Sequence, residues 1–286
     1  MSIAHVLDLI RCPLCRAPFV AAPGRVRCTT GHAFDLARQG YLNLLGRAAP
    51  PHADTVDMVA ARSRFLDAGY FGPVSTALAG LIPKPEPTLL DVGAGGGHYL
   101  AELLSRRGGR AVALDISPAA CRRAARVAGA LGAVVADAWA PLPLIDHGFD
   151  AVLSIFAPRQ PAEFARVLAR DGRLLVATPL PEHLAELREA LQLLDIQPDK
   201  EDRLYAALRP HFTPAGRQEV RLQLSLDPHA VQDVVAMGPN AFHRTADELR
   251  GAIESLAMPQ SVTGAIAVTA WAPARPGTNC VLYSSA

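Results

Sequence analysis

The sequence predicts an α/β fold in which a mostly parallel sheet follows a small metal-binding module. Two observations lead to this prediction. From residue 87 onward, short apolar runs alternate with helical patterns, as in a chain that connects parallel strands by helices. Ahead of them, three of the five cysteines lie within the first 28 residues, close to His32 and among turn-forming prolines and glycines.

Length and composition exclude several classes of protein. A chain of 286 residues has room for one catalytic domain and a small module. Half of the residues are hydrophobic and 19% are charged, which excludes a disordered chain. We find no apolar run of about eighteen residues and no secretion signal at the start, so we expect a cytoplasmic protein without a membrane partner.

The charge distribution is uneven along the chain. The net charge of +1 excludes a uniformly basic nucleic-acid binder. Residues 1–47, however, contain six arginines against the two acids Asp8 and Asp35. The N-terminal end is therefore the basic end, although only two lysines occur in the whole chain and a general preference for arginine explains the bias equally well.

The first 46 residues have the spacing of a zinc site. A Cys-x₂-Cys pair is followed after twelve residues by Cys-x₃-His, which supplies three thiolates and one imidazole for a closed tetrahedral ion. A module this small needs such a staple to fold. The predicted ligands are Cys12, Cys15, Cys28 and His32. The candidate phosphate contacts between them are Arg16, Arg25 and Arg27.

After the break at Ala49-Pro50-Pro51, periodicity predicts a helix over Thr55–Phe71 and then the main sheet. The predicted strands are 88–93, 111–116, 133–138, 149–156 and 172–179. The predicted helices between them are 98–107, 117–128, 161–169 and 182–194. The tail adds strands at 220–227 and 262–271, and a helix near 245–256 announced by Thr245 and Glu248 in capping-box spacing. Cys121 and Cys280 are interpreted as packing residues.

The first of these strands ends in a glycine-rich loop, Asp91-Val92-Gly93-Ala94-Gly95-Gly96-Gly97-His98. Glycines in a strand–loop–helix turn let the backbone approach a ligand at the helix N-terminus, which indicates a nucleotide-like cofactor. The dinucleotide fingerprint requires glycine where His98 stands, so NAD is disfavoured. We predict S-adenosylmethionine instead, with its charged methionine end at Asp91.

Two further acids follow the next strands. Asp115 closes the second strand, where a carboxylate can accept both ribose hydroxyls. Asp137 closes the third, where it and the Ala138 amide can address the adenine edge. After the fourth strand, the segment Ser154-Ile155-Phe156-Ala157-Pro158 is not the Asn-Pro-Pro-Tyr typical of adenine amino methylation, and this indicates another acceptor. His183 lies at the start of the helix after the fifth strand, a place where histidine is often structural.

Together these motifs resemble the RlmA-type bacterial 23S rRNA (guanine-N1)-methyltransferases, which include the tylosin-resistance enzymes. The resemblance covers nearly the whole chain. It depends on Cys12-Pro13-Leu14-Cys15, Gly31-His32 with Phe34-Asp35, Gly40-Tyr41-Leu42-Asn43-Leu44-Leu45, Ala61-Arg62, Phe65 through Gly69, the Asp91 loop, Phe156-Ala157-Pro158, and Thr178-Pro179 with His183-Leu184. The chain departs from the family at His98, where an aromatic residue is common, and at Ala53-Asp54, where Gly-Asp is commoner.

The resemblance implies a zinc-binding RNA-recognition module (1–46), a helical linker (47–86) and a class I, Rossmann-like methyltransferase domain (87–286). It implies methyl transfer to N1 of a guanine in the hairpin-35 loop of 23S rRNA. It also implies cofactor contacts from Phe71 or Tyr70, from Gly97 and His98, and from His183, and it allows a homodimer. The Ala- and Arg-rich composition suggests an actinobacterial member, hence the more 3′ of two neighbouring guanines and resistance to tylosin-type macrolides.

Guanine N1 carries a proton, so the reaction needs a base or stabilisation of the deprotonated ring. The candidates are His183 and Asp91. A rival interpretation is a small-molecule methyltransferase with a purely structural zinc module. A third is an RNA-binding zinc protein with a degenerate methyltransferase fold, which the presence of Asp91, Asp115 and Asp137 disfavours.

Overall fold

The computed structural model describes residues 2–127, 129–197, 199–242 and 246–274. The strands are β1 (Phe19–Ala22), β2 (Arg25–Cys28), β3 (Ala33–Asp35), β4 (Leu42–Asn43), β5 (Thr88–Val92), β6 (Arg110–Asp115), β7 (Leu131–Val135), β8 (Phe149–Ile155), β9 (Leu168–Pro179), β10 (Phe212–Leu226) and β11 (Gln260–Pro273). The α-helices are α1 (Val56–Asp67), α2 (Gly72–Leu81), α3 (His98–Arg107), α4 (Pro118–Ala124), α5 (Pro161–Val167), α6 (Ala185–Leu191), α7 (Lys200–Leu208), α8 (Pro228–Ala236) and α9 (Ala246–Glu254). Single 3₁₀ turns are η1 (Ser2–His5), η2 (Leu7–Leu9) and η3 (Pro239–Phe242).

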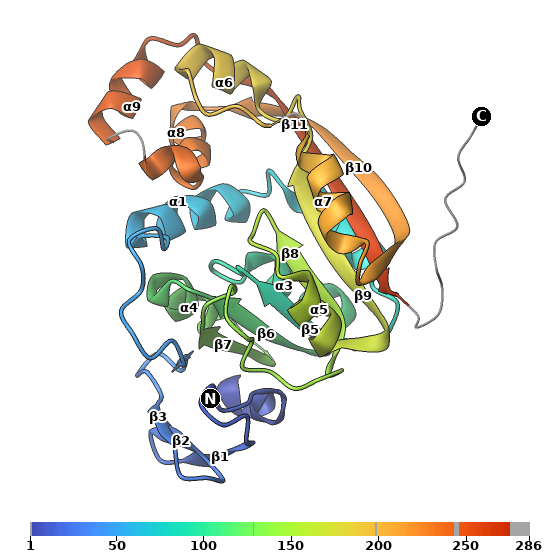
Figure 1. Ribbon diagram of the computed structural model, residues 1–286. Helices are drawn as coiled ribbons and strands as arrows, with labels where there is room; N and C mark the ends of the chain where they lie inside the picture. The colour runs from blue at the N-terminus through green and yellow to red at the C-terminus, as the bar shows by residue number, and fades with distance from the viewer. Residues whose placement is uncertain (1, 128, 198, 243–245, 275–286) are drawn as a thin grey trace, which may run out of the picture.

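These strands form two sheets (Figure 1). The small antiparallel sheet has the order β1-β2-β3. The large one has the order β10-β11-β9-β8-β5-β6-β7-β4, parallel from β9 to β4 and antiparallel where β11 joins β9 and β10. The order reverses between β5 and β8, so the carboxyl ends of these strands open the crevice where α/β folds bind ligands.

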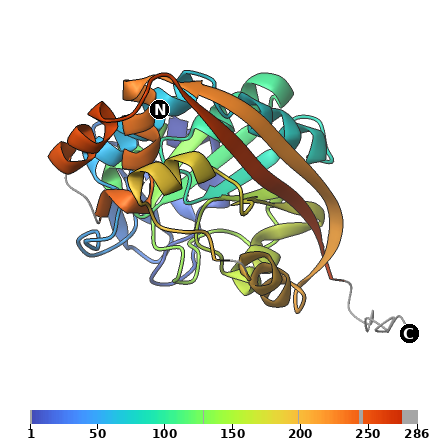
Figure 2. The same ribbon diagram turned by 90° about the horizontal axis from the view of Figure 1, so that it is seen from above.

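The two faces of the large sheet bury separate sets of side chains. Along β5, Leu89 packs with α1 to α4 on one face, while Leu90 packs with the N-terminal turns, α5 and α7 on the other. Alternating side chains of a strand point to opposite faces, and both faces are covered, so the central strands are apolar throughout. Figure 2 shows the long β10–β11 ribbon crossing the molecule beside the helices α6, α8 and α9.

The N-terminal segment packs tightly against the large sheet. Ile3 and Val6 lie against β7, where a Cβ on Gly132 would overlap the Val6 side chain at 2.2 Å and lie 3.2 Å from that of Ile3. Ile10 forms an isolated bridge with Leu144 of the main domain. Strand β4, which falls within the predicted 1–46 module, pairs in parallel with β7 at the edge of the large sheet. The zinc module and the main domain therefore share one apolar core.

The predicted α/β class and the five central strands are confirmed, but several details differ. The helix predicted to reach Phe71 ends at Asp67, because Gly69 takes a left-handed conformation (φ 84°) and α2 starts anew at Gly72. Strand β7 ends at Val135, so Asp137 lies in the following loop rather than closing the strand. We did not predict β1 to β4, α2, α7 or α8. Helix α9 is present, whereas Thr245 and Cys280 lie outside the described residues.

Within those described ranges, no helix has the length and apolar character needed to cross a membrane.

Candidate functional site

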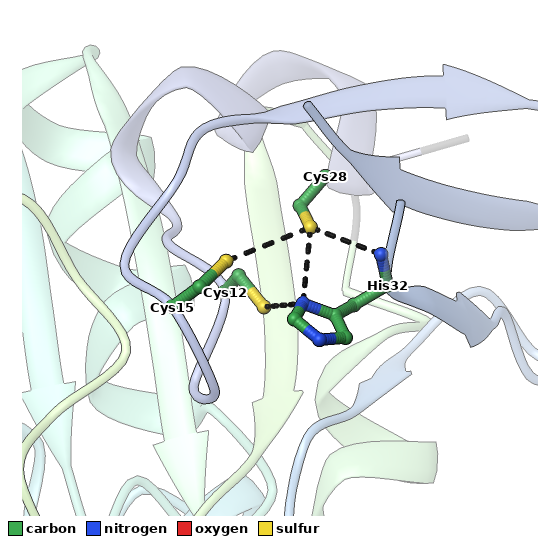
Figure 3. A group of neighbouring side chains, drawn as sticks. All are labelled: Cys12, Cys15, Cys28 and His32. Carbon is green, nitrogen blue, oxygen red and sulfur yellow. Dashed lines mark hydrogen bonds between the residues drawn. The ribbon is translucent and has the colours of Figure 1, made fainter. Parts of the chain in front are cut away.

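The four predicted zinc ligands come together at one point of the N-terminal module (Figure 3). Their ligand atoms all lie within 4.8 Å of one another, with Cys15 Sγ 3.7 Å from Cys28 Sγ and His32 Nδ1 3.5 Å from Cys28 Sγ. Zinc–sulfur bonds of about 2.3 Å in a tetrahedron put two sulfurs roughly 3.8 Å apart, so the arrangement fits a zinc ion. The protein supplies all four ligands of a tetrahedral zinc ion and leaves no open position, which is the pattern of a structural zinc site.

The module is held against the main domain by Arg16. Its guanidinium donates to the carbonyls of Leu142 (2.6 Å) and Leu144 (3.0 Å) and lies 3.6 Å from Asp146. Docking thus occupies two of the five guanidinium N–H donors of Arg16, which makes Arg16 a weaker candidate for phosphate contact than Arg25 and Arg27. Arg25 forms only an exposed pair with Asp35 at 3.7 Å, which leaves it available to a ligand.

The glycine-rich loop lines a cavity of about 530 Å³ at the carboxyl end of β5. Gly93 and Gly95 have positive φ angles of 78° and 53°. A Cβ on Gly93 would lie 2.6 Å from the Cβ of Ala157, so no larger residue fits between the loop and the segment after β8. Gly97 has φ 80° but packs toward Ala124 of α4 and does not line the cavity.

Asp91 lies beneath this loop and is 1% exposed. Its Oδ1 has no hydrogen-bond partner among the described residues. Burial, and then the nearby charge of Asp115, raise the pKa of Asp91 to about 8. A buried carboxylate with an unused oxygen facing a cavity fits the ammonium group of S-adenosylmethionine, which would supply the missing donor and charge.

Asp115 and Asp137 lie farther along the same cavity. Both oxygens of Asp115 accept backbone hydrogen bonds at 2.8 Å, from Gly95 N–H and Ser117 N–H, and this fixes the carboxylate in place. Asp137 accepts from Trp139 N–H (2.9 Å) and pairs with Arg47 at 2.8 Å. Each carboxylate keeps lone pairs for the hydroxyl and amino groups of an adenosine.

A second cavity of about 980 Å³ adjoins the first. Phe71, Trp139 and Phe156 line both cavities and so form the boundary between them. Phe156 is 44% exposed and has a left-handed backbone (φ 53°), a conformation that bulky residues rarely adopt outside functional sites. Its ring stacks on His183, with centroids 6.2 Å apart and an interplanar angle of 22°.

His183 lines only this second cavity, next to Phe71 at a centroid distance of 5.8 Å. Its Nδ1 accepts a hydrogen bond from Ala265 N–H (3.2 Å), so the neutral ring carries its proton on Nε2. Burial, followed by the charges of Arg188 and Lys200, lowers the pKa of His183 to about 4. The ring is therefore a neutral hydrogen-bond donor at physiological pH.

Eight of the ten predicted cofactor residues line the smaller cavity, and Gly97 and His183 do not. Sequence reasoning did not assign roles to Asp54, Arg62 or Trp139. Asp54 and Arg62 form an ion pair at the junction of the two cavities, and Arg62 also donates to the Met237 carbonyl at 2.6 Å. Trp139 is 62% exposed and lines both cavities, and this exposure is a property of the folded chain that the sequence does not show.

Two family models match the chain. The model described as "RlmA, N-terminal", a zinc ribbon, matches residues 10–47, and the model described as "Methyltransferase domain" matches residues 90–176. The first range contains all four cysteine and histidine ligands, and the second contains the glycine-rich loop.

Curated relatives match most of the length of the chain. The 23S rRNA (guanine(748)-N(1))-methyltransferase of Streptomyces fradiae is 42% identical over 94% of this chain and 98% of its own length. A Micromonospora griseorubida protein with a provisional name as a 23S rRNA (guanine-N(1)-)-methyltransferase is 40% identical over the same shares.

Solved structures support the fold alone. The complex of the Haloferax volcanii Trm112 methyltransferase activator with a methyltransferase matches with a TM-score of 0.53 at 19% identity, and it covers 79% of this chain and 100% of that one. A SAM-dependent methyltransferase from Thiobacillus denitrificans in complex with S-adenosyl-L-homocysteine matches with a TM-score of 0.50 at 15% identity, over 74% of this chain and 98% of that one.

Proposed function

Since the chain belongs to the RlmA-type family of 23S rRNA (guanine-N1)-methyltransferases, we propose that it methylates N1 of a guanine in the hairpin-35 loop of 23S rRNA. It is a methyltransferase whose cofactors are S-adenosylmethionine and zinc. The observation that carries the proposal is the 42% identity with the Streptomyces fradiae enzyme, which extends over the zinc ribbon and the catalytic domain together. The more 3′ of the two neighbouring guanines and resistance to tylosin-type macrolides complete the proposal.

The smaller cavity holds the cofactor in this proposal. Asp91 binds the ammonium group, Asp115 the ribose hydroxyls, and Asp137 with the Ala138 amide the adenine edge. Support comes from the fact that all of them line one cavity and from the unused oxygen of Asp91. When bound, S-adenosylmethionine supplies an electrophilic methyl group, and the chain positions the acceptor nitrogen in line with it.

The larger cavity receives the extruded guanine, whose face stacks on Phe156 at the boundary with the cofactor. His183 and Asp91 were both candidates for the base that removes the N1 proton. The Nε2–H of His183 is instead suited to donate to guanine O6, where negative charge grows as N1 loses its proton. Asp91 lines only the cofactor cavity, which supports a binding role for it.

The zinc module provides the grip on the RNA backbone in this proposal. Arg25 and Arg27 project from β2, with exposed residues at both positions, while Arg16 serves docking. The proposed division is a 1–46 module, a 47–86 linker and an 87–286 catalytic domain. Strand β4 of the module nevertheless pairs with β7 of the catalytic domain. The reaction places the enzyme in the cytoplasm, and a homodimer would widen the surface for a hairpin.

The test offers the zinc-loaded protein labelled S-adenosylmethionine and unmodified 23S rRNA, and then maps the label by primer extension. N1-methylguanine blocks base pairing, so we expect a new stop in the hairpin-35 loop at the more 3′ guanine. Ribosomal RNA already methylated at that position is the matched control and accepts no label. Absence of label in RNA, with cofactor binding demonstrated by calorimetry, would refute the proposal and favour a small-molecule acceptor.

A further inference from the structure

Within the described ranges, two cations that line the larger cavity have no carboxylate partner. Arg159 follows β8, and its guanidinium donates to a carbonyl, that of Ala157, at 3.3 Å. Lys200 is the first residue of α7, and no acceptor contacts its Nζ within the described part of the chain. The only other lysine of the sequence, Lys84, pairs with Asp150 at 2.9 Å and Asp171 at 3.1 Å.

The acids of the same cavity are already neutralised by other residues. Asp54 pairs with Arg62, and Asp195 pairs with Arg188 at 2.8 Å. Arg203, the remaining cavity arginine, pairs with Asp199 at 3.2 Å. The ion pairs among the residues of this cavity therefore leave the positive charges of Arg159 and Lys200 uncompensated.

Both uncompensated side chains are partly withdrawn from water. Burial lowers the pKa of Arg159 and of Lys200, and the charge of Arg159 lowers the pKa of Lys200 further. Like charges held together in a partly dry cavity cost folding free energy unless a ligand supplies an anion. His183 lines the same cavity as both cations, so they share the cavity with the ring that we assign to the guanine.

We propose that Arg159 and Lys200 form an anion site that binds a backbone phosphate of the nucleotide whose base enters the larger cavity. The proposal rests on the function proposed above. Neither residue lines the cofactor cavity, which separates this site from the methionine carboxylate of S-adenosylmethionine. An extruded nucleotide brings its own phosphates to the mouth of the pocket, and a forked guanidinium with a point ammonium charge suits a phosphodiester.

The test removes each charge separately in Arg159→Gln and Lys200→Gln. Arg209→Gln is the matched control, because it removes a cation from the exposed far end of α7, outside both cavities. Binding of a hairpin-35 RNA to the protein loaded with S-adenosylhomocysteine is measured over a salt series. We expect each pocket variant to lose about tenfold in RNA affinity. The slope of log K against log salt should fall by about 0.7–0.9 per variant, and Lys200→Arg should restore it.

Cofactor affinity and thermal stability are measured on the same variants. We expect unchanged S-adenosylmethionine affinity and an equal or higher thermal midpoint, because a repulsive charge has been removed. Weaker cofactor binding with an unchanged salt slope would assign the anion to the methionine carboxylate and overturn the inference. A lowered midpoint with unchanged RNA affinity would show a merely structural role and overturn it too.

The two proposals fail in distinguishable ways. Wild-type protein that methylates the rRNA, while both variants keep its affinity and salt slope, overturns only the phosphate site. Wild-type protein that neither binds nor modifies 23S rRNA overturns the proposed function and this inference with it.

Discussion

Replacing Asp91 by asparagine should stabilise the cofactor-free protein and weaken cofactor binding at once. Asp91 is 1% exposed, its Oδ1 is unpartnered, and its pKa rises from 3.8 to about 8 on folding. A folded pKa above the unfolded value means that the contribution to stability is present below the unfolded pKa and is lost as the pH rises through the folded one. Asparagine cannot ionise, so the Asp91→Asn variant does not lose stability in this way as the pH rises.

The size of the effect follows from the two pKa values. At about 1.4 kcal/mol per pKa unit, ionisation of Asp91 lowers the free energy of unfolding by about 4 kcal/mol between pH 5 and pH 8. The thermal midpoint shifts by roughly 2–4 °C per kcal/mol. The midpoint of Asp91→Asn relative to that of wild type should therefore be roughly 10 °C higher at pH 8 than at pH 5. Loss of a charge-assisted contact should weaken S-adenosylmethionine binding roughly 10- to 100-fold.

Thermal unfolding of the cofactor-free proteins at both pH values, and calorimetric titration with S-adenosylmethionine at pH 7, measure the two effects. Asp202→Asn, an exposed acid on α7, is the control and should change neither quantity by a comparable amount. If the midpoints of Asp91→Asn and wild type differ by the same amount at pH 5 and at pH 8, the claim that the buried charge of Asp91 destabilises the protein is refuted. Unchanged cofactor affinity would refute its role in binding.

Three further outcomes are expected. Gly93→Ala should lower the free energy of unfolding by about 1–3 kcal/mol and abolish cofactor binding in calorimetry, because its Cβ would lie 2.6 Å from that of Ala157; normal binding would contradict the close loop approach. Chelation of zinc, or Cys28→Ser, should lower the thermal midpoint and expose the shared apolar core to a hydrophobic dye, and an unchanged midpoint would rule out a structural ion. The pKa of His183 lies near 4, below its unfolded value, so the free energy of unfolding should fall as the pH drops from about 6.5 to 4. In acid titrations, His183→Asn should reduce this pH dependence of stability. A kcat profile with a limb near pH 6.5 that vanishes in His183→Asn would instead make His183 the base.

The sequence predicts most of the residues that line the smaller cavity, because its signals are local. Glycines with positive φ and acids at strand ends stand a few residues apart in the chain, and parallel strands bring their carboxyl ends to one edge. Helix α8 also had local signals that we did not use: Asp227 caps it by accepting from Ala230 N–H at 2.7 Å, and Pro228 occupies its first turn.

The acceptor side could not be predicted in the same way. Arg159 and Lys200 are 41 positions apart. Their significance depends on which carboxylates other arginines occupy, which is a property of the folded cavity. Strand β4 has two residues and pairs with β7 far along the chain, so no periodicity identifies it. The first half of β10 is mostly exposed, which hides it from any burial pattern.

The docking of the zinc module by β4, Arg16 and the Ile10–Leu144 bridge fixes the distance between the two ends of the enzyme. A module on a flexible tether could grip a hairpin at many offsets from the catalytic pocket. Here the offset is constant, so under the proposed function the separation between the gripped backbone and the reactive base would be a length standard built into the fold. Under the proposed function, choice between two neighbouring guanines, which present identical edges to a pocket, would then be a matter of spacing along the RNA.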